Sequence, residues 1–573
     1  MKPFTNAFHA LARKFRAARR VRTRGLQNSA RLFVGRVPSP GVLTSIQDQC
    51  EKCGLTAVGQ ACWLAVLLVG PGSSAAAGLA WPANRLLPAF STPAATIDCI
   101  ELTNVSGPEV DLFVSLEGLV NRVQPHLACV ANPDQEGETG WLTIHRLHVQ
   151  RVDGFDAVEK YQGEIHGLVV VDPARPETLN LATTLAGLDD ALICDPSLLP
   201  KLTQAPFHLK IVEDLRGRFS TRDEVYDFLL KEIWPRCSHR IIAGLSPRTH
   251  GDLRDLLVAV NAAVFWLDPK IKEDAAVLAR FVPSLQPAHA LYVGWWPDED
   301  AGLKWIGQFG IPVLASDFFQ NASLFGGVPE KITPLPVAPP PPLQNRVYVA
   351  CYLSDGDNVQ YMQHSLKRLW ADPARGRVPI GWTVSPLAAD LDPAMLQYYY
   401  RTATTNDCLV SGPSGAGYAR LDFWKPADLD AFTKITNPYL ERSGLRIITV
   451  WLRVDDAIGN SFGANCPALL GLMSHAGGSR EQLFGALPMM GFVEGANYAN
   501  SVAKLHASLD EAAKDWNGTA PKFLAVQASA WRVPPSGLAQ LAEVLDTNKF
   551  VLVRPDHWFQ LYALRQQSRQ TNK

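Results

Sequence analysis

Two aspartates that flank a glycine, Asp355 and Asp357, are the residues whose types and spacing best suit chemistry. They follow the apolar run 347–353, which predicts a strand, and Gly356 between them can adopt a positive φ angle. Paired carboxylates divide the roles of general acid and of base or nucleophile when their surroundings separate their pKa values. The structural alternative is an Asx turn in which Asn358 caps the following helix.

Further carboxylates follow two later apolar runs. Asp455 stands beside Asp456, and successive side chains of an extended strand point to opposite faces, so only one of the two can face a site. Glu494 lies between glycines after another apolar run, where it could act as an acid or a base. The candidate catalytic residues are therefore Asp355, Asp357, Asp455 and Glu494, with a turn that carries solvated charges as the alternative for Asp455.

Aromatic and polar side chains near the same predicted strand ends suit a sugar. Tryptophan and tyrosine rings offer apolar faces on which the C–H groups of a sugar stack, and their edges form hydrogen bonds. The candidate substrate-binding residues are Asn358, Tyr418, Trp451, Trp531, Asp556 and His557. Tyr418 follows the glycine-rich loop 412–417, which lacks the lysine of a phosphate-binding Walker loop, so we expect a tight loop that presents the tyrosine.

A metal site is the competing interpretation of the first aspartate pair. Asp355 and Asp357 could ligate a divalent cation together with His557 or His364. The His-x-x-x-His pair typical of metal-dependent deacetylases is missing from residues 344–565. We therefore predict no bound metal and no cofactor.

The candidate residues lie after strand-like runs in the second half of the chain. These seven runs are 347–353, 380–385, 408–411, 445–452, 487–492, 523–527 and 550–554. Helical stretches lie between most of them, which predicts an α/β fold with a C-terminal (β/α)7 TIM-like barrel; an open, doubly wound sheet is the alternative. In such a barrel the active site forms at the carboxyl ends of the strands, where the candidates would meet.

A smaller α/β domain precedes the predicted barrel. Apolar runs alternate with helical stretches there, which indicates a mostly parallel sheet. Six prolines in the eleven residues 333–343 exclude a helix or a central strand and predict a stiff linker. The expected parts are a leader at 1–80, a spacer at 81–97, the N-terminal α/β domain at 98–332, the linker at 333–343, the barrel at 344–565 and a tail at 566–573.

The beginning of the chain has the pattern of an export signal. Residues 1–47 carry ten basic side chains and no acidic one, and residues 54–84 carry no charge. The apolar run Ala61–Val69 is too short to span a bilayer by itself and is followed by small residues, as in a signal peptide. We expect cleavage between about Ala77 and Trp81, a secreted or periplasmic protein, and no stable membrane insertion after the leader is removed.

Composition and charge exclude several classes. Of the 573 residues 47% are hydrophobic, which is too many for a disordered protein. The net charge of −1 falls to −10 for residues 81–573, which argues against a nucleic-acid partner because phosphate binding needs a basic surface. The seven cysteines after the leader are scattered singly and suggest neither a disulfide framework nor a zinc site.

Several stretches resemble one known family. The segment Gly415-Ala416-Gly417-Tyr418-Ala419-Arg420-Leu421 resembles the signature of the GxGYxYP family, although Arg420-Leu421 replaces its closing Tyr-Pro. The stretches Asp355–Asn358 and Arg554–His557 look like barrel motifs of that family, and Ser115–Arg122 and Asn180–Leu188 look like its N-terminal domain. The resemblance spans about residues 98–565.

The resemblance implies a hydrolase class associated with polysaccharide breakdown in bacteria, without implying a particular reaction. Together with the residues above, it favours a glycoside hydrolase that acts on a polysaccharide or oligosaccharide by carboxylate acid/base chemistry at the barrel mouth. Two alternatives stay open. One is a metal-dependent polysaccharide deacetylase-like enzyme that uses Asp355 and Asp357, and the other is a non-catalytic glycan-binding protein, which the altered signature would suit.

Overall fold

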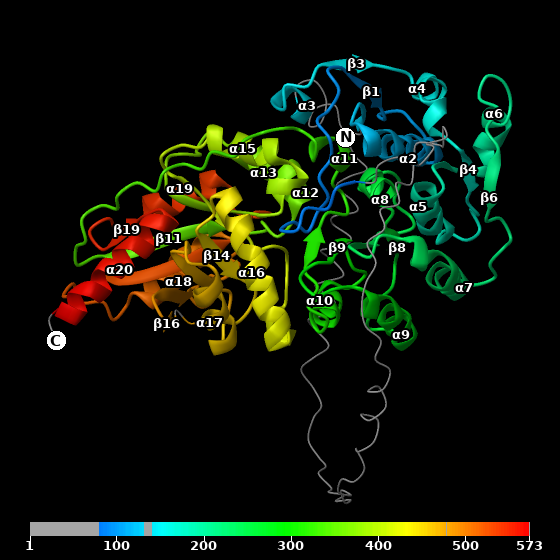
Figure 1. The fold of residues 1–573 in the computed structure, drawn as a ribbon. Helices are drawn as coiled ribbons and strands as arrows, with labels where there is room; N and C mark the ends of the chain where they lie inside the picture. Colours follow the sequence, from blue (N-terminus) through cyan, green and yellow to red (C-terminus); the bar gives the residue numbers. More distant parts are fainter. Residues whose placement is uncertain (1–78, 131–139, 477, 479, 572–573) are drawn as a thin grey trace, which may run out of the picture. The chain divides into compact units, whose positions relative to one another are not determined.

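A computed structural model describes residues 79–130, 140–476, 478 and 480–571 (Figure 1). The predicted leader lies outside the described residues except for its last two. The seven cysteines in the described part are buried and form no disulfide bond with one another. No helix there is long and apolar enough to cross a bilayer.

The N-terminal part contains three small parallel sheets where the sequence predicts one, and they are coloured blue to green in Figure 1. Their strand orders are β2-β1-β3, β5-β4-β6 and β10-β9-β7-β8. The strands are β1 Ile97–Glu101, β2 Leu127–Val130, β3 Val149–Arg151, β4 Gly167–Val170, β5 Ala191–Cys194, β6 Ile211–Asp214, β7 Ile241–Gly244, β8 Ala263–Phe265, β9 Leu291–Gly294 and β10 Val313–Ala315. The α/β class that the sequence predicts is confirmed.

One helix, α2 (Gly107–Val123), connects these sheets. Its residues are buried without interruption from Asp111 to Asn121, as expected of a helix that is covered on all sides. It contacts β2 of one sheet, β5 of another and helix α8 beside the third. The other helices of this part are α3 Trp141–Ile144, α4 Gly154–Lys160, α5 Thr178–Leu188, α6 Leu199–Leu202, α7 Arg222–Phe228, α8 Arg254–Ala259, α9 Lys272–Phe281, α10 Glu299–Gly307 and α11 Ala322–Phe325.

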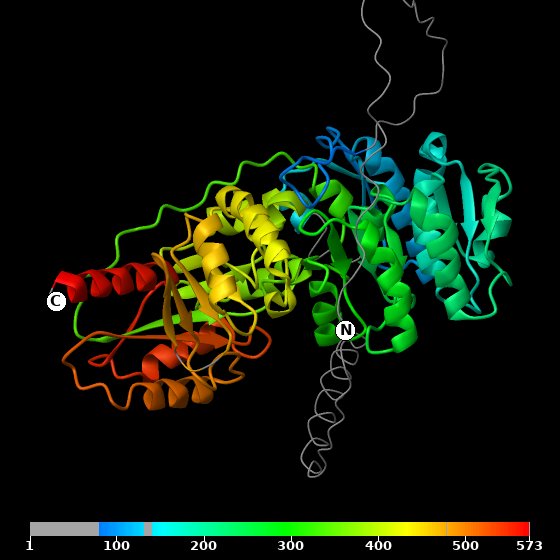
Figure 2. The ribbon, with the colours of Figure 1, turned by 60° about the horizontal axis from the view of Figure 1, so that its bottom comes forward.

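The linker 333–343 carries neither helix nor strand, as its prolines predict, and Figure 2 shows it as a long green trace. A nine-stranded sheet follows, with the order β16-β17-β15-β14-β13-β12-β11-β18 and with β19 also paired to β11. Its strands are β11 Val347–Leu353, β12 Ile380–Val384, β13 Asp407–Ser411, β14 Ile447–Val450, β15 Gly471–Ser474, β16 Glu481–Phe484, β17 Leu487–Gly491, β18 Lys522–Ala528 and β19 Phe550–Leu552. Apart from β16, which is antiparallel to β17, all of them are parallel.

Helices connect these strands and cover the sheet. They are α12 Val359–Gln363, α13 Ser365–Trp370, α14 Ala388–Leu391, α15 Pro393–Arg401, α16 Pro426–Ser443, α17 Asp456–Asn465, α18 Val502–Ala512, α19 Pro535–Val544 and α20 Pro555–Thr571. Within the described residues β17 and β18 form no ladder. Instead, the N–H groups of Val493 and Ala499, in the chain that follows β17, donate to the carbonyls of Ala525 and Gln527 in β18, at 2.9 and 2.8 Å.

Candidate active site

The predicted aspartate pair lies in a tightly packed loop after β11. The N–H of Gly356 donates to Thr383 Oγ1 at 3.0 Å, and a Cβ on Gly356 would lie 2.1 Å from the Thr383 carbonyl carbon. On the other side, a Cβ on Gly412 would lie 2.3 Å from the Gly356 carbonyl carbon. Both positions therefore require glycine, because two backbones pass in direct contact. This packing fixes the loop that carries Asp355, whose own φ is +80°.

Asp355 is surrounded by hydrogen-bond donors. The hydroxyl of Tyr498 lies 3.1 Å from Oδ1 and 3.3 Å from Oδ2, and the side chains of Ser354 and Trp531 also bond to this carboxyl. Burial raises the pKa of Asp355 to about 7, although these hydrogen bonds oppose the shift by stabilising the charged form. A carboxyl with this pKa titrates near neutral pH.

Asp357 is the second carboxyl of the loop. Burial raises its pKa well above the usual range, and the nearby charges of Asp355 and Glu299 raise it further. No donating side chain stabilises its charged form among the described residues. The two aspartates therefore differ in environment, which is the condition for separate acid and base roles.

Glu299 is a third carboxyl, which the sequence analysis missed. It is the first residue of α10 and therefore belongs to the N-terminal part of the chain, yet its Oε1 accepts a 2.8 Å hydrogen bond from the hydroxyl of Tyr418. Burial raises its pKa. A signal is present in the sequence, because Trp295-Trp296-Pro297-Asp298-Glu299 follows β9 and so places a carboxyl after a strand of the N-terminal part as well.

Backbone contacts join the two parts of the chain at this point. Tyr418 and Val313 of β10 exchange N–H···O bonds of 2.7 and 3.0 Å, and Ala315 of β10 bridges to Asn358. Gly417 has a φ of +116°, and a Cβ there would lie 2.8 Å from Pro312 Cβ, so this approach needs glycine. The glycine-rich loop thus holds Tyr418 against β10 and aims its hydroxyl at Glu299.

Aromatic rings surround the three carboxyls. Trp295 lies parallel to Tyr418 with ring centroids 6.2 Å apart, and Trp451 meets Tyr418 edge-on at 6.0 Å. His475, after β15, lies below Trp451 at 5.1 Å, and burial lowers its pKa to about 3, so the ring is neutral. Apolar ring faces beside buried carboxyls are the features by which proteins bind and cleave sugars.

Three family models match this chain. The model described as "GxGYxYP putative glycoside hydrolase C-terminal domain" matches residues 345–563, "GxGYxYP_N second domain" matches 165–237 and "GxGYxYP third domain" matches 239–326. The chain belongs to the GxGYxYP family. The second and third family domains coincide with the sheets β5-β4-β6 and β10-β9-β7-β8, so Glu299 lies in the third domain and the two aspartates lie in the C-terminal domain.

A solved structure is similar to this chain in fold. A crystal structure described as a putative hydrolase from Bacteroides thetaiotaomicron VPI-5482 has a TM-score of 0.74 and 21% identity over 85% of this chain and 99% of that chain. A putative polysaccharide deacetylase from Mycobacterium smegmatis has a TM-score of only 0.30 and 12% identity, over 42% of this chain and 96% of that one. No curated protein sequence matches the chain.

The altered end of the GxGYxYP signature still contacts the N-terminal part. Arg420, at the position of the second signature tyrosine, is buried and forms a two-point ion pair with Asp422 at 2.9–3.0 Å. Its Nη1 also donates to Asp300 of α10 at 2.6 Å. The arginine therefore ties the signature loop to the helix that carries Glu299, next to the Tyr418 contact.

Two predicted site residues cap helices, and a third is exposed to solvent. Asn358 caps α12 by accepting from the Tyr361 N–H at 2.8 Å, which is the helix-cap alternative, although it stays in the aspartate loop. Asp455 caps α17 by accepting from the Ile458 N–H at 3.0 Å. Glu494 is exposed. The structure joins neither Asp455 nor Glu494 to the Asp355 carboxyl by a hydrogen bond.

Asp556 and His557 lie away from the carboxyl cluster. Strand β19 ends at Leu552, which pairs with Val349 in the middle of β11, so the chain turns before it reaches the carboxyl edge of the sheet. Arg554 binds both oxygens of Asp556 and donates to the carbonyl of Thr405, which precedes β13. The structure therefore places this pair near the amino ends of the strands, because β19 covers only the first half of β11.

Metal ligation finds no support in the described residues. They contain no group of three or more His, Cys, Asp or Glu side chains arranged to hold a metal ion. His557 follows β19 under the sheet, and the Nε2 of His364 lies 3.3 Å from the Phe318 carbonyl. Neither histidine is placed with Asp355 and Asp357 as a ligand set would require.

Proposed function

We propose that this protein is a glycoside hydrolase that cleaves a polysaccharide or oligosaccharide. The observation that carries the proposal is the set of three carboxyls, Asp355, Asp357 and Glu299, which have raised pKa values and lie among aromatic rings at the carboxyl ends of parallel strands. The family description supports the class, and the different environments of Asp355 and Asp357 suit separate acid and base roles.

The environments of the two aspartates suggest a division of roles. Asp357, whose pKa is raised by burial and by two neighbouring carboxyls and whose charged form has no side-chain donor among the described residues, is suited to protonate the leaving oxygen. Asp355, held by Tyr498, Ser354 and Trp531, has the hydrogen bonds that stabilise an anion and is suited to act as base or nucleophile.

Glu299 completes the proposed site from the other part of the chain. Its negative charge would raise the pKa of both aspartates, and the Tyr418 hydroxyl stabilises that charge. Glu299 is therefore suited to keep Asp357 protonated and to contact the sugar or a water molecule between the two parts. Such an effect of one carboxylate on another is the ordinary result of like charges in a buried site.

We infer that the C-terminal sheet is an incomplete TIM-like barrel. Seven parallel strands follow one another around the sheet as β17-β15-β14-β13-β12-β11-β18, and the two hydrogen bonds from Val493 and Ala499 to β18 replace the missing ladder. In a sheet of this order the loops that follow the carboxyl ends of the strands lie on one face, where the proposed site is.

Export remains the expectation for the place of action. The basic, then apolar, then small-residue order of 1–80 supports it, and polysaccharides are substrates found outside the cytoplasm. N-terminal sequencing of protein recovered from the periplasm or medium should find a start between about Ala77 and Trp81. Recovery of an uncleaved chain in the cytoplasm would contradict this expectation.

The test of function is release of sugars from a panel of plant, host and microbial polysaccharides by the wild type, Asp355→Asn and Asp357→Asn. Release by the wild type alone supports the proposal and its two aspartates. Equal release by all three proteins keeps a hydrolase but rejects these roles. Glycan binding without release by any of them supports the binding-protein alternative, and release of acetate instead of sugar supports the deacetylase alternative.

A further inference from the structure

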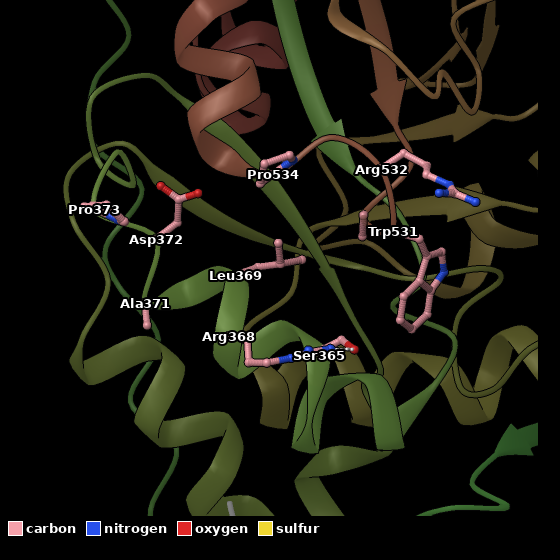
Figure 3. A pocket seen from close by; sticks show the side chains of 10 residues that line it. Ser365, Arg368, Leu369, Ala371, Asp372, Pro373, Trp531, Arg532 and Pro534 are labelled. Carbon is pink, nitrogen blue, oxygen red and sulfur yellow. Dashed lines mark hydrogen bonds between the residues drawn. The ribbon is translucent and has the colours of Figure 1, made fainter. Parts of the chain in front are cut away.

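A cavity of about 550 Å³ opens beside the carboxyl cluster. It lies between the end of α13 with the turn that follows it, and the loop after β18 (Figure 3). Its lining includes Ser365, Arg368, Leu369, Asp372, Trp531 and Arg532. A cavity of this size holds about one to two sugar rings, because binding sites for small molecules begin near 300 Å³.

Trp531 is shared by the cavity and the carboxyl cluster. Its side chain bonds to Asp355, and its ring meets Tyr361 edge-on at 5.6 Å, which fixes its orientation. The residue is nevertheless 44% exposed. An immobilised indole with an accessible surface is a platform for a sugar ring. A sugar stacked on it would be next to the unit held by Asp355.

Two arginines give the cavity a positive charge. Arg368 donates to Ser365 Oγ at 2.9 Å, while the Arg532 side chain forms no hydrogen bond within the described residues. Neither guanidinium has an ion pair there. The one carboxylate of the lining, Asp372, already accepts from the N–H groups of Ala374 and Ser536 at 2.8 and 3.2 Å.

In Figure 3 the Trp531 indole lies between Arg532 and the Arg368–Ser365 pair. Unpaired guanidinium groups on both sides of an aromatic platform are suited to an anionic sugar, because the planar fork matches a carboxylate while the ring stacks. This local positive charge contrasts with the acidic balance of residues 81–573.

We infer that this cavity is a subsite for an anionic sugar unit, a uronate, stacked on Trp531 with its carboxylate at Arg532, while Arg368 adds positive charge on the other side of the ring. The inference rests on the proposed function and narrows it to an acidic polysaccharide. A sulfated sugar offers the same chemistry, a ring that carries an anion. The ring would sit one unit away from the bond that Asp355 and Asp357 cleave.

The test is binding, measured by ligand-observed NMR on the Asp357→Asn protein, so that turnover does not enter. The probes are glucuronate, galacturonate, mannuronate and guluronate as methyl glycosides, their neutral counterparts, and galactose 6-sulfate. At least one anionic sugar should bind roughly tenfold more tightly than its neutral counterpart, since a hydrogen bond to a charged group contributes about 1.5–3 kcal/mol. Preference for the uronate or for the sulfate identifies the anion.

Variants assign the preference to this cavity. Arg532→Gln should remove most of the preference for the anion and leave neutral sugars unchanged, and Trp531→Ala should weaken both. Arg401→Gln, an exposed arginine at the end of α15 and outside the cavity, is the matched control and should change neither. Equal binding of charged and neutral sugars, no binding of any probe, or a preference that survives in Arg532→Gln with Arg368→Gln would overturn the inference.

The two proposals fail separately. Sugar release from neutral polysaccharides only, with no anionic preference in binding, would keep the hydrolase and reject the acidic subsite. Anionic sugars bound at Arg532 without sugar release from any polymer would keep the subsite and reject the hydrolase.

Discussion

The hydroxyl of Tyr418 donates a 2.8 Å hydrogen bond to Oε1 of Glu299, a residue 119 positions earlier in the chain. The tyrosine of the family signature therefore contacts a carboxyl that belongs to a different domain. This relationship gives the signature a physical role. Its glycines allow the backbone to approach β10, and its tyrosine then orients a carboxyl next to two aspartates.

The first prediction concerns that hydrogen bond. In Tyr418→Phe the backbone bonds to Val313 are kept, so the fold should persist, but the charged form of Glu299 loses its donor. Because this bond lowers the pKa of Glu299, its removal raises that pKa further. The limb of the pH profile that reports the ionisation of Glu299 should therefore move to higher pH. The pH profile of kcat/KM measures the shift, and Glu299→Gln should abolish that limb. An unchanged profile in Tyr418→Phe would show that the contact has no catalytic consequence.

The second prediction separates the carboxyls. Asp355→Asn and Asp357→Asn should each lower kcat by about 10²–10⁴-fold, which is the usual contribution of general acid or base catalysis. Asp455→Asn makes the same chemical change at a helix cap, where asparagine serves as well as aspartate, so its kcat should stay near that of the wild type. The measurement is the kcat of the three variants on a polysaccharide that the wild type cleaves. A larger loss in Asp455→Asn than in Asp355→Asn would transfer the catalytic role to the loop after β14.

The third prediction concerns stability against pH. A carboxyl whose pKa is about 7 in the folded protein and near 3.9 when unfolded keeps its proton longer in the native state, so stability falls as pH rises through that window. Asp355→Asn removes this pH-dependent contribution of the carboxyl to the free energy of unfolding. Between pH 5 and pH 8 the wild type should lose on the order of 2–3 kcal/mol more unfolding free energy than the variant does. Chemical denaturation at both pH values tests it, and parallel losses would mean that Asp355 does not hold the raised pKa.

The fourth prediction concerns the packing beneath the aspartates. Gly356→Ala places a methyl group 2.1 Å from the backbone of Thr383, where no flexible side chain can move aside. We expect a loss of about 3 kcal/mol or more in unfolding free energy, together with loss of activity, because the aspartate loop must shift. Gly163→Ala, which adds a methyl group with no atom within 4 Å, is the control and should stay within about 0.5 kcal/mol of the wild type. Thermal or chemical denaturation of the two variants is the measurement, and similar stabilities would contradict the account of this loop.

The strands that the sequence predicts best are those that are apolar on both faces. The run 347–353 coincides with β11, and the run 380–385 covers β12, because a buried parallel strand is continuously apolar. The sequence analysis predicts no strand at β15 or β16, since Gly-Leu-Met-Ser is short and β16 is largely exposed. The division of the N-terminal part into three sheets was not predicted either. The sequence of a strand of three to five residues does not indicate which other strands it pairs with.

The site was predictable in part for a related reason. Asp355, Asp357, Tyr418, Trp451 and Trp531 follow strands whose carboxyl ends meet, so one local pattern finds them all. Glu299 follows a strand of another sheet, and only the three-dimensional pairing of β10 with the signature loop brings it near. For Asp556 the same pattern leads to the wrong end of the sheet. The residue does follow a strand, β19, but this strand ends beside the middle of β11 and does not reach the carboxyl ends.

The paired backbone of Val313 and Tyr418 has an evolutionary consequence. Residues 345–563 match a family model of their own, yet copied into another gene without the sheet of residues 239–326 they would lose one carboxyl and the partner of their signature loop. The C-terminal domain is therefore poorly suited to transfer between genes without the preceding domain. Its lineage is expected to inherit both parts together, and loss of either gene segment would leave a product without the complete set of three carboxyls.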